Sequence, residues 1–510
     1  MRFWLYDLAI HVFTFAIRQA ALFNPKAHLW VMGRKEWRER LAQEPIIVHR
    51  SSFKILWIHA ASLGEFEQGR PIIEVFRERF PHWKIVLTFF SPSGYEIRKD
   101  YPHADLVCYL PADTRQNARD FLNLIQPDLA IFIKYEFWAN YLFELKKRDV
   151  PTLLVSALFR PSQPFFKWYG DLWREMLGCF THIFVQNELS GQLLQNIGIQ
   201  NLTVAGDTRV DRVLKIAENA PLNEIVQDFV GAGSDQVLVV GSSWEADESV
   251  ILDSIRTDTK HLKLIIAPHE PSESNVMRIV KKVENAVRYS RWFEVTSPRH
   301  EEVSSQTSSR MPSGEMSPLT SEVSSQTSSG MPFGEMSPPL TSEVSSQTSS
   351  GMPCGEMSPP RTSEMTPQTS SGMPFGEMSP PRTSEMTPPQ KSYLIIDNIG
   401  LLNTLYRYGT VAYIGGGFGK GIHNTLEPAA FGLPIIFGPK YEKFEEARQF
   451  VSRGGAFSIR NSEELATILF KLQDPGFYKN ASDAVLAYLE ENRGATGKVM
   501  AFLEEIFGGH

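Results

Sequence analysis

Short apolar runs alternate with amphipathic stretches along most of this 510-residue chain, and this alternation constrains the fold more than any other feature. Helical patterns such as Phe66–Phe80 and Asn117–Ile125 separate the apolar runs of a first series. That series comprises Ile55–Ile58, Ile85–Phe89, Leu106–Tyr109, Leu129–Ile133, Thr152–Val155 and His182–Val185. Such alternation predicts an α/β fold in which helices cover both faces of a parallel sheet.

A second series of apolar runs follows a polar, glycine-containing stretch at Val213–Asp235, which we interpret as a domain boundary. The series comprises Val237–Val240, Leu262–Ile266, Tyr393–Ile396, Val411–Ile414 and Ile435–Phe437. Two similar α/β domains are expected to leave a ligand-binding cleft at the carboxyl ends of their strands.

A block of tandem repeats at 297–391 interrupts the second series. A 21-residue unit rich in Ser, Thr, Pro, Gly and Met recurs from Thr320, Thr341 and Thr362, with a fragment at Thr383. The unit has too few aliphatic residues to form a packed core, so we predict a disordered insertion. The alternative is a stacked β-repeat.

The first 25 residues differ from the α/β pattern. Residues 3–23 are mostly apolar and aromatic, and they are interrupted by Asp7, His11 and Arg18. Basic residues follow at Lys26, Arg34, Lys35, Arg38 and Arg40. An apolar, aromatic helix beside a basic segment favours a membrane surface with anionic headgroups. We therefore predict a membrane-associated helix that lies in the interface, and the alternative is a helix packed on its own domain.

Composition excludes several function classes. The net charge of -7 argues against general nucleic-acid binding, which requires a basic field. The three cysteines are scattered without the spacing of metal ligands. We predict no nucleic-acid partner and no metal site.

The stretch Gly409–Pro439 carries the clearest binding signal. An apolar strand is followed by five glycines within seven residues and by a helix predicted to begin near Asn424–Thr425. Glycines allow close backbone approach, and free N–H groups at a helix start attract an anion. Glu427, in the first helical turn, is placed to accept hydrogen bonds from ribose hydroxyls. The pattern predicts a nucleotide site, although an ordinary tight βα turn is an alternative.

Three further candidates follow predicted strands. Glu65 ends HAASLGE, Glu136 lies in KYEFWAN, and Arg209 lies in GDTRVD. A carboxylate on a cleft rim is suited to act as a general base, and Arg209 offers a fixed cation. Taken alone, each has a structural alternative: a helix cap, a solvated loop residue or a surface arginine.

These motifs, with IIDNIGLL and the Gly409–Pro439 stretch, occur in an order that resembles the 3-deoxy-D-manno-octulosonic acid (Kdo) transferases of lipopolysaccharide synthesis. The resemblance covers nearly everything outside the repeats. It implies a GT-B fold, in which two Rossmann-like domains face a cleft. It also implies CMP-Kdo as donor, with no separate cofactor, and a lipid A precursor (lipid IVA) as acceptor.

The resemblance implies roles for the catalytic candidates. Glu65 matches the family's proton acceptor, and Glu136 matches a supporting catalytic Glu in a motif similar to ELWPN, where Ala139 replaces Pro. Arg209 matches a position that is usually Lys and is assigned to transition-state stabilisation. Arginine keeps the positive charge and changes its shape.

The resemblance also implies a set of CMP-binding residues. Asn424, Thr425, Leu426 and Glu427 match NPLE, with Thr425 in place of Pro. The segment of Ile399, Gly400 and Leu401 matches MGEL, and loss of its Glu leaves backbone contacts to the cytosine or ribose. Pro268 and His269 match PRHPER only in part.

The resulting organisation has four parts. A membrane-associated helix at 1–25 precedes an acceptor domain at 26–215, and a CMP-sugar domain is formed by 216–296 and 392–510, interrupted by the 297–391 repeats. The expected activity is inverting transfer of Kdo at the cytoplasmic face of the inner membrane, without a metal in the transfer step. Alternatives are a GT-B transferase with another nucleotide sugar, and an inactive membrane-associated binding module.

Overall fold

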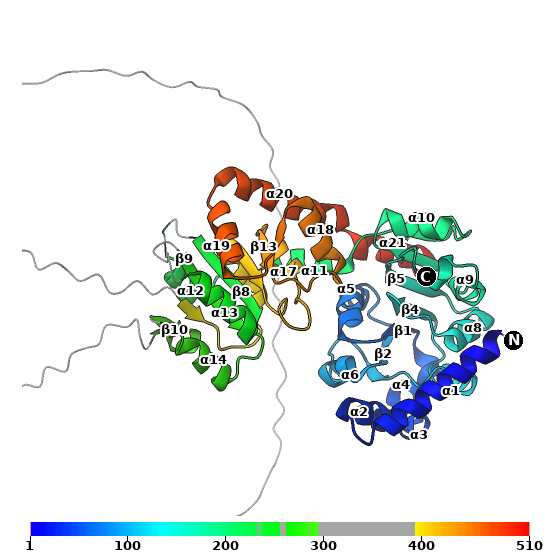
Figure 1. The fold of residues 1–510 in the computed structure, drawn as a ribbon. Helices are drawn as coiled ribbons and strands as arrows, with labels where there is room; N and C mark the ends of the chain where they lie inside the picture. Colours follow the sequence, from blue (N-terminus) through cyan, green and yellow to red (C-terminus); the bar gives the residue numbers. More distant parts are fainter. Residues whose placement is uncertain are drawn as a thin grey trace, which may run out of the picture. The chain divides into compact units, whose positions relative to one another are not determined.

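A computed structural model describes residues 2–231, 233, 236–255, 262–283, 285–293 and 393–508. The repeat block, and with it the prediction of disorder there, lies outside the described residues. The rest forms one compact unit with two parallel sheets (Figure 1). These sheets confirm the predicted class, an α/β protein with two parallel-sheet domains.

The first sheet has the strand order β3-β2-β1-β4-β5-β6-β7, with every neighbouring pair parallel. Its strands are β1 (Ile55–Ala60), β2 (Lys84–Phe89), β3 (Leu106–Tyr109), β4 (Leu129–Ile133), β5 (Thr152–Ala157), β6 (His182–Val185) and β7 (Leu202–Val204). Successive residues point to opposite faces, so Trp57 belongs to one core and Ile58 to the other. Helices on both faces explain why the strands are apolar throughout.

The helices of this domain follow the strands in βα order. They are α5 (Leu63–Arg79), α6 (Pro92–Arg98), α7 (Arg115–Ile125), α8 (Ala139–Lys147), α9 (Asp171–Leu177) and α10 (Glu188–Gln195). Glu65 lies in the first turn of α5, and Glu136 lies in the turn between β4 and α8.

The second sheet has the order β10-β11-β9-β8-β12-β13-β14 and is also fully parallel. Its strands are β8 (Gln236–Ser243), β9 (Leu262–Pro268), β10 (Ala286–Arg288), β11 (Tyr393–Ile395), β12 (Val411–Ile414), β13 (Ile435–Phe437) and β14 (Ala456–Ser458). The helices are α12 (Glu224–Val230), α13 (Glu245–Ser254), α14 (Glu273–Val280), α16 (Leu402–Leu405), α17 (Leu426–Ala429), α18 (Glu445–Arg453), α19 (Ser462–Lys471) and α20 (Pro475–Asn492).

Two helices link the domains. The first, α11 (Thr208–Glu218), contacts both α5 and α17, and together with α12 it makes the predicted boundary largely helical. The second, α21 (Ala495–Phe507), packs against α5, and its Val499 and Leu503 are buried in a core of the first sheet. This packing corrects the predicted boundary, because residues 495–507 complete the first domain. The apolar period of a helix does not reveal which sheet it covers.

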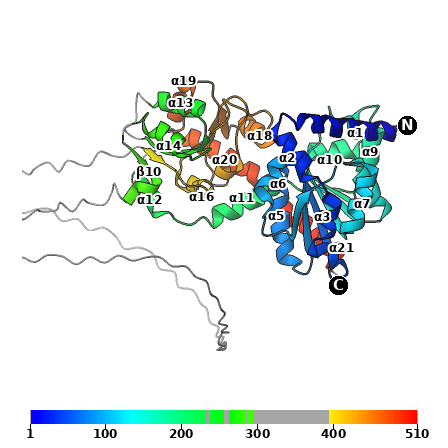
Figure 2. The same cartoon turned by 90° about the horizontal axis from the view of Figure 1, so that it is seen from below.

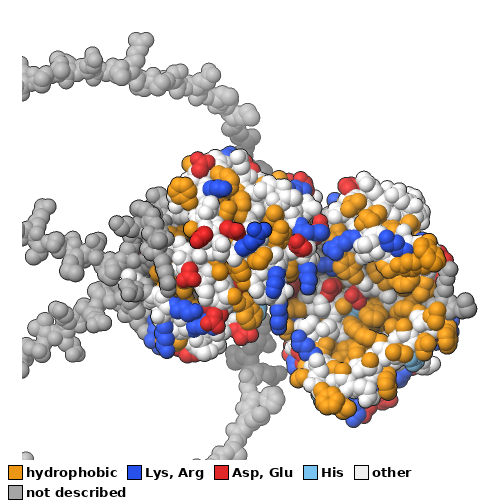
Figure 3. Space-filling view, in the orientation of Figure 1, with side chains coloured by type: hydrophobic (Ala, Val, Ile, Leu, Met, Phe, Trp, Pro, Cys, Tyr) orange, Lys and Arg blue, Asp and Glu red, His pale blue; other side chains and the backbone are white. Residues whose placement is uncertain are grey.

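Four helices precede the first strand: α1 (Arg2–Ala20), α2 (Pro25–Gly33), α3 (Trp37–Ala42) and α4 (Pro45–Val48). Two perpendicular views show α1 lying along the first domain (Figures 1 and 2). It leaves large apolar side chains exposed, including Trp4, Val12 and Phe15. Hydrophobic side chains also gather over this domain on the face seen in Figure 3. Among the described helices, none is both long and apolar enough to cross a bilayer.

Candidate active site

Glu65 lies in the first turn of α5, just beyond the carboxyl end of β1. Its Oε2 accepts a hydrogen bond from the Ser62 hydroxyl, and its side chain is half-buried. The short Ser62–Gly64 turn therefore fixes one carboxylate oxygen and leaves the other available to a substrate.

Glu136 is buried in the turn between β4 and α8. The indole Nε1 of Trp138 donates to Glu136 Oε2 at 2.8 Å and also approaches His59 Nε2 at 3.0 Å. His59 Nε2 lies 3.4 Å from the same carboxylate oxygen, and its Nδ1 is 2.9 Å from Thr88 Oγ1. This buried network fixes the orientation of Glu136 through a side chain from β1 and another from its own turn.

Arg209, which the sequence predicted as a fixed cation, lies in the first turn of α11 between two carboxylates. Its guanidinium is held by Asp207 at 2.6 Å and by Glu446 of α18 at 3.0 Å. Both carboxylates are buried, and together they raise the pKa of Arg209 well above its ordinary range, although its burial acts in the opposite direction. Two anions around one cation leave little positive charge for a substrate.

Lys134 is a residue that the motif reading missed. It directly follows β4 in a left-handed conformation with φ 68°, which is uncommon for a residue with a side chain. Burial and then the charge of Arg209 lower its pKa, whereas Asp207, Glu446 and Glu65 act to raise it. Lys134 thus lies in the field of the proposed base and its neighbours.

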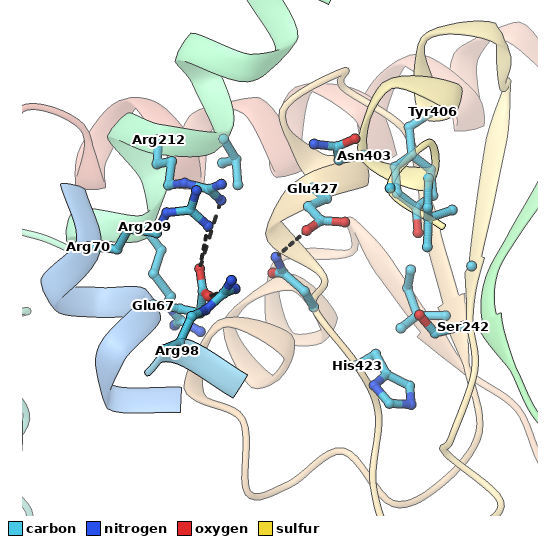
Figure 4. Close-up of a pocket in the computed structure, with 16 residues that line it drawn as sticks. Glu67, Arg70, Arg98, Arg209, Arg212, Ser242, Asn403, Tyr406, His423 and Glu427 are labelled. Carbon is cyan, nitrogen blue, oxygen red and sulfur yellow. Dashed lines mark hydrogen bonds and ion pairs between the residues drawn. The ribbon is translucent and has the colours of Figure 1, made fainter. Parts of the chain in front are cut away.

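A cavity of about 430 Å³ lies between elements of both domains (Figure 4). The first-domain wall contributes Glu67 and Arg70 of α5 together with Arg98 of α6. The linking helix α11 contributes Arg209, Arg212 and Val213. The second-domain wall comprises Gly241, Ser242, Gly400, Leu402, Asn403, Tyr406, Ile414, His423, Asn424 and Glu427.

Three arginines of this wall share one carboxylate. Glu67 lies 2.9 Å from Arg98, 3.7 Å from Arg70 and 3.9 Å from Arg212. Arg70 is also paired with Glu74, at 2.7 Å. The Nε of Arg98 is buried without a hydrogen-bond partner. An excess of guanidinium groups and an unmet donor make this wall suited to an anion.

The glycine turn after β12 does not line the cavity. A Cβ on Gly415 would lie 2.2 Å from the carbonyl oxygen of Ser242, and one on Gly417 would lie 2.5 Å from the backbone nitrogen of Gly438. The Gly416 N–H, at φ 93°, donates to buried Asp247 at 2.8 Å. These glycines are required because neighbouring backbone segments pack against them, a requirement that the sequence pattern does not distinguish from phosphate binding.

The predicted helix beginning at Asn424–Thr425 is only one turn long, because α17 covers Leu426–Ala429. Asn424 is exposed; its Oδ1 accepts from the Leu426 N–H at 3.1 Å, and its Nδ2 donates to Glu427 Oε1 at 3.0 Å. Asn424 and Glu427 line the cavity, whereas Leu426 is buried in the core. A helix this short has too few aligned peptide dipoles to attract a phosphate strongly.

Glu427 faces the cavity with one oxygen bound to Asn424. Burial raises its pKa, while the Asn424 hydrogen bond and the charge of Arg212 act to lower it. Thr425, in place of a proline, is fully buried, and its hydroxyl has no partner. The side chain of Thr425 therefore lies in the core and does not line the cavity.

The remaining residues predicted to bind CMP lie in two segments, 268–269 and 399–401. Pro268 ends β9 and is buried, and the exposed His269 stacks between Trp244 at 4.6 Å and His423 at 4.3 Å. Gly400 lines the cavity at φ 92°, and Leu401 packs against the core. Ile399 is 89% exposed and does not line the cavity. The ring of His423 connects the aromatic stack to the cavity wall.

The sequence reading missed most of the basic wall. Arg70, Arg98 and Arg212 lie on three helices outside any of the recognised motifs, and surface arginines are common on helices. The packing of α5 against both α6 and α11 brings them together. Within the described part of the chain, no cluster of three or more His, Cys, Asp or Glu side chains could hold a metal ion.

A cavity beside the carboxyl ends of the strands of two parallel-sheet domains is where α/β proteins commonly bind their ligands. A sequence model of the family described as 3-deoxy-D-manno-octulosonic-acid transferase (kdotransferase) matches residues 35–212. The chain is 23% identical to the 3-deoxy-D-manno-octulosonic acid transferase of Rickettsia bellii over 488 residues, covering 94% of each chain. It is 21% identical to that of Haemophilus influenzae, covering 88% of this chain and 86% of the relative.

Among solved structures, a putative UDP-N-acetylglucosamine 2-epimerase from Listeria monocytogenes covers 90% of this chain and 98% of its own. Its TM-score is 0.49 and its identity 9%. A likeness of this size carries no argument about activity. The sequence similarity bears on function, because it extends over most of this chain to enzymes named as Kdo transferases.

Proposed function

We propose that this enzyme has a GT-B fold and transfers Kdo from CMP-Kdo to a lipid A precursor. The observation that carries the proposal is the cavity of Figure 4, where the basic wall of α5, α6 and α11 faces Asn424 and Glu427. A CMP-activated sugar acid carries a phosphate and a carboxylate, so it needs cations. Arg70, Arg98 and Arg212 supply them.

The second-domain wall suits the nucleotide part of the donor. Glu427 has one oxygen committed to Asn424 and the other available for ribose hydroxyls. The aromatic stack of Trp244, His269 and His423 offers a flat surface beside the cavity, against which a pyrimidine can pack. Gly400 contributes backbone at close range.

The transfer itself needs a base and stabilisation of the leaving group. Glu65 would take the proton of the acceptor hydroxyl while that oxygen attacks the anomeric carbon and CMP departs with the bonding electrons. One displacement of this kind inverts the anomeric configuration. Glu136 would support the acceptor side of the reaction, and the basic wall would stabilise the phosphate as it gains charge.

Arg209 has a more limited role in this proposal than a free cation would have. Its two carboxylate partners belong to different domains, Asp207 at the start of α11 and Glu446 on α18. Its contribution would be to hold these elements together beside the cavity.

The acceptor lipid would reach the site from the cytoplasmic face of the inner membrane, where the exposed apolar residues of α1 contact the interface.

Donor competition tests the proposed substrate. The purified full-length enzyme should transfer sugar to a lipid A precursor from CMP-Kdo and not from UDP-sugars, and product mass spectrometry measures the transfer. Transfer from a UDP-sugar alone would identify a different glycosyltransferase. The absence of transfer from any donor would leave only a binding module.

Substitution of the proposed base tests the mechanism. Glu65→Gln preserves the size of the side chain and removes its basicity, so we expect kcat to fall by about a thousandfold. Glu78→Gln, an exposed position on the same helix, is the control and should retain activity. Full activity in Glu65→Gln would show that another group is the base.

A further inference from the structure

The helix α8, which follows the Glu136 turn, begins without a cap of its own. Its N-cap residue, Trp138, makes no capping hydrogen bond with its side chain. The first N–H groups of a helix have no partner within the helix and need acceptors from elsewhere. Here Ala139 N donates to the Tyr6 hydroxyl at 3.3 Å, and Asn140 N and Tyr141 N each donate to the Asp113 carboxylate at 3.1 Å.

One of these interactions leads directly to α1, and the neighbouring residue of α1 adds another. The Tyr6 hydroxyl donates to Asp113 Oδ2 at 2.5 Å while it accepts from Ala139. On the next residue, Asp7 Oδ1 accepts from Asn140 Nδ2 at 3.0 Å, and its other oxygen is 2.8 Å from Arg115. The first turns of the N-terminal helix are therefore bonded to the first turn of α8, more than 130 residues away.

A second contact between α1 and the Glu136 turn is aromatic. Phe13 of α1 stacks on Phe90 with ring centres 6.1 Å apart, and Phe90 packs on Trp138 at 4.6 Å. Trp138 is the residue whose indole N–H binds Glu136. Polar and aromatic contacts from α1 thus converge on the short segment between β4 and α8.

We propose that Tyr6 and Asp7 are positioning residues for the transfer reaction: by capping α8, the N-terminal helix fixes the turn that carries Glu136. This proposal rests on the role given to Glu136 above. It assigns α1 a task beyond membrane contact, because its inward face builds the active site while its outward face meets the lipid. The acceptor membrane and the catalytic turn then share one structural element.

The backbone at Ala139 makes the proposal testable. If Tyr6 loses its hydroxyl, the Ala139 N–H remains buried without an acceptor, which is unfavourable. A proline at 139 would have no N–H to satisfy, and proline is well tolerated at the first position of a helix. The preceding residue, Trp138, has φ -92° and ψ 96°, an extended conformation compatible with a following proline. Ala139→Pro should therefore remove the need for the Tyr6 hydroxyl as an acceptor.

The experiment compares four full-length enzymes: wild type, Tyr6→Phe, Ala139→Pro and the double variant. The assay measures kcat and KM with CMP-Kdo and a lipid A precursor in detergent micelles. We expect about a tenfold lower kcat for Tyr6→Phe with KM nearly unchanged, and activity within about twofold of wild type for Ala139→Pro. The double variant should recover the part of the lost kcat that comes from the unpaired Ala139 N–H, while the part that comes from the lost Tyr6–Asp113 hydrogen bond should remain. If Tyr6 had only a structural role and did not influence Glu136, Ala139→Pro would not restore kcat in the Tyr6→Phe variant.

Controls separate the possible outcomes. Gln19→Ala, an exposed change on the same helix, should leave kcat unaltered. If Tyr6→Phe fails to fold by circular dichroism, Asp7→Asn tests the neighbouring contact of α1 with Asn140 and should lower kcat severalfold. A normal kcat in the folded Tyr6 or Asp7 variant, or no recovery in the double variant, overturns the positioning role. An inactive wild-type enzyme would instead contradict the proposed function.

Discussion

Two buried carboxylates follow strands of the two sheets, and they differ in how fully they are hydrogen-bonded. Asp247, at the start of α13, accepts from Tyr413 at 3.0 Å, Gly416 N at 2.8 Å and Trp244 N at 3.0 Å. Glu136 accepts from the indole of Trp138 at 2.8 Å and has His59 at 3.4 Å. Asp247 thus accepts three hydrogen bonds, whereas Glu136 retains more unused acceptor capacity.

The difference shows how each sheet builds its carboxyl edge. Asp247 ties the glycine turn to the β8–α13 connection, so the second edge is held by close contacts between backbone segments. The carboxyl edge of the first sheet is held by side chains. They orient Glu136 and leave part of its hydrogen-bond acceptor capacity unused. A buried carboxylate with unused acceptor capacity costs stability, and enzymes retain such groups where chemistry needs them.

The largest effect is expected from a substitution that disrupts the backbone packing at the carboxyl edge of the second sheet. Gly415→Ala would place a Cβ 2.2 Å from the Ser242 carbonyl oxygen, a clash with backbone that cannot easily move. We expect a loss of about 3 kcal/mol in the free energy of unfolding, measured by chemical denaturation. Gly419→Ala, whose Cβ would lie 3.5 Å from its nearest neighbour, is the matched control and should cost less than about 1 kcal/mol. Equal losses at both positions would refute the packing explanation.

Two single substitutions, one at Asp247 and one at Glu136, test the difference between these carboxylates. In Asp247→Asn the new amide cannot accept from all three donors, so we expect a loss of about 2 kcal/mol in stability. Glu136→Gln should leave the denaturation midpoint nearly unchanged and lower kcat about 100-fold. The measurements are denaturation curves and initial rates for both variants. The distinction fails if Glu136→Gln is the less stable protein or remains fully active.

The smallest predicted effect is a change of stability with pH that comes from His423, in the aromatic stack of the second domain. Burial, with a smaller contribution from His269, lowers the pKa of His423 to about 4. His423 therefore binds a proton near pH 6.5 in the unfolded chain but only near pH 4 in the folded chain. Because the unfolded state is the one that gains the proton between these values, the free energy of unfolding decreases as pH falls from 6.5 to 4. Because this ring is partly exposed, we expect roughly 1 kcal/mol.

Thermal unfolding of wild type and His423→Asn between pH 7 and pH 5 measures this contribution. The wild type should lose more stability than the variant across that range. Parallel curves for the two proteins would show that His423 titrates normally in the folded state.

The strands were predictable because burial on both faces makes a parallel strand apolar along its whole length. Leu106–Tyr109, Leu129–Ile133, His182–Val185 and Val411–Ile414 occur with the predicted bounds. The short edge strands β7, β10 and β14 were missed, because three residues leave too short a pattern. The bounds of helices were less accurate, as α5 begins at Leu63 and not at Phe66.

The candidate site was only partly predictable. Motifs located Glu65, Glu136 and Glu427 because each lies in a connection or helix start that follows the carboxyl end of a strand, a position that topology determines. They did not reveal that Arg209 is neutralised by Glu446, since that partner lies 237 residues away and belongs to the other domain. The same reason hid the role of Tyr6, whose partner at Ala139 is brought close only by the tertiary fold.

The position of α21 has a consequence for how the protein is made. The first sheet ends with β7 at Val204, but the helix that completes its core begins at Ala495, about 290 residues later. At ribosomal rates of about 5–20 residues per second, this interval lasts roughly 15–60 seconds. Nearly a third of it is spent on the 297–391 repeats. Throughout that time the nascent domain that carries Glu65 has an uncovered apolar face, so chaperone dependence should rise with the number of repeat copies.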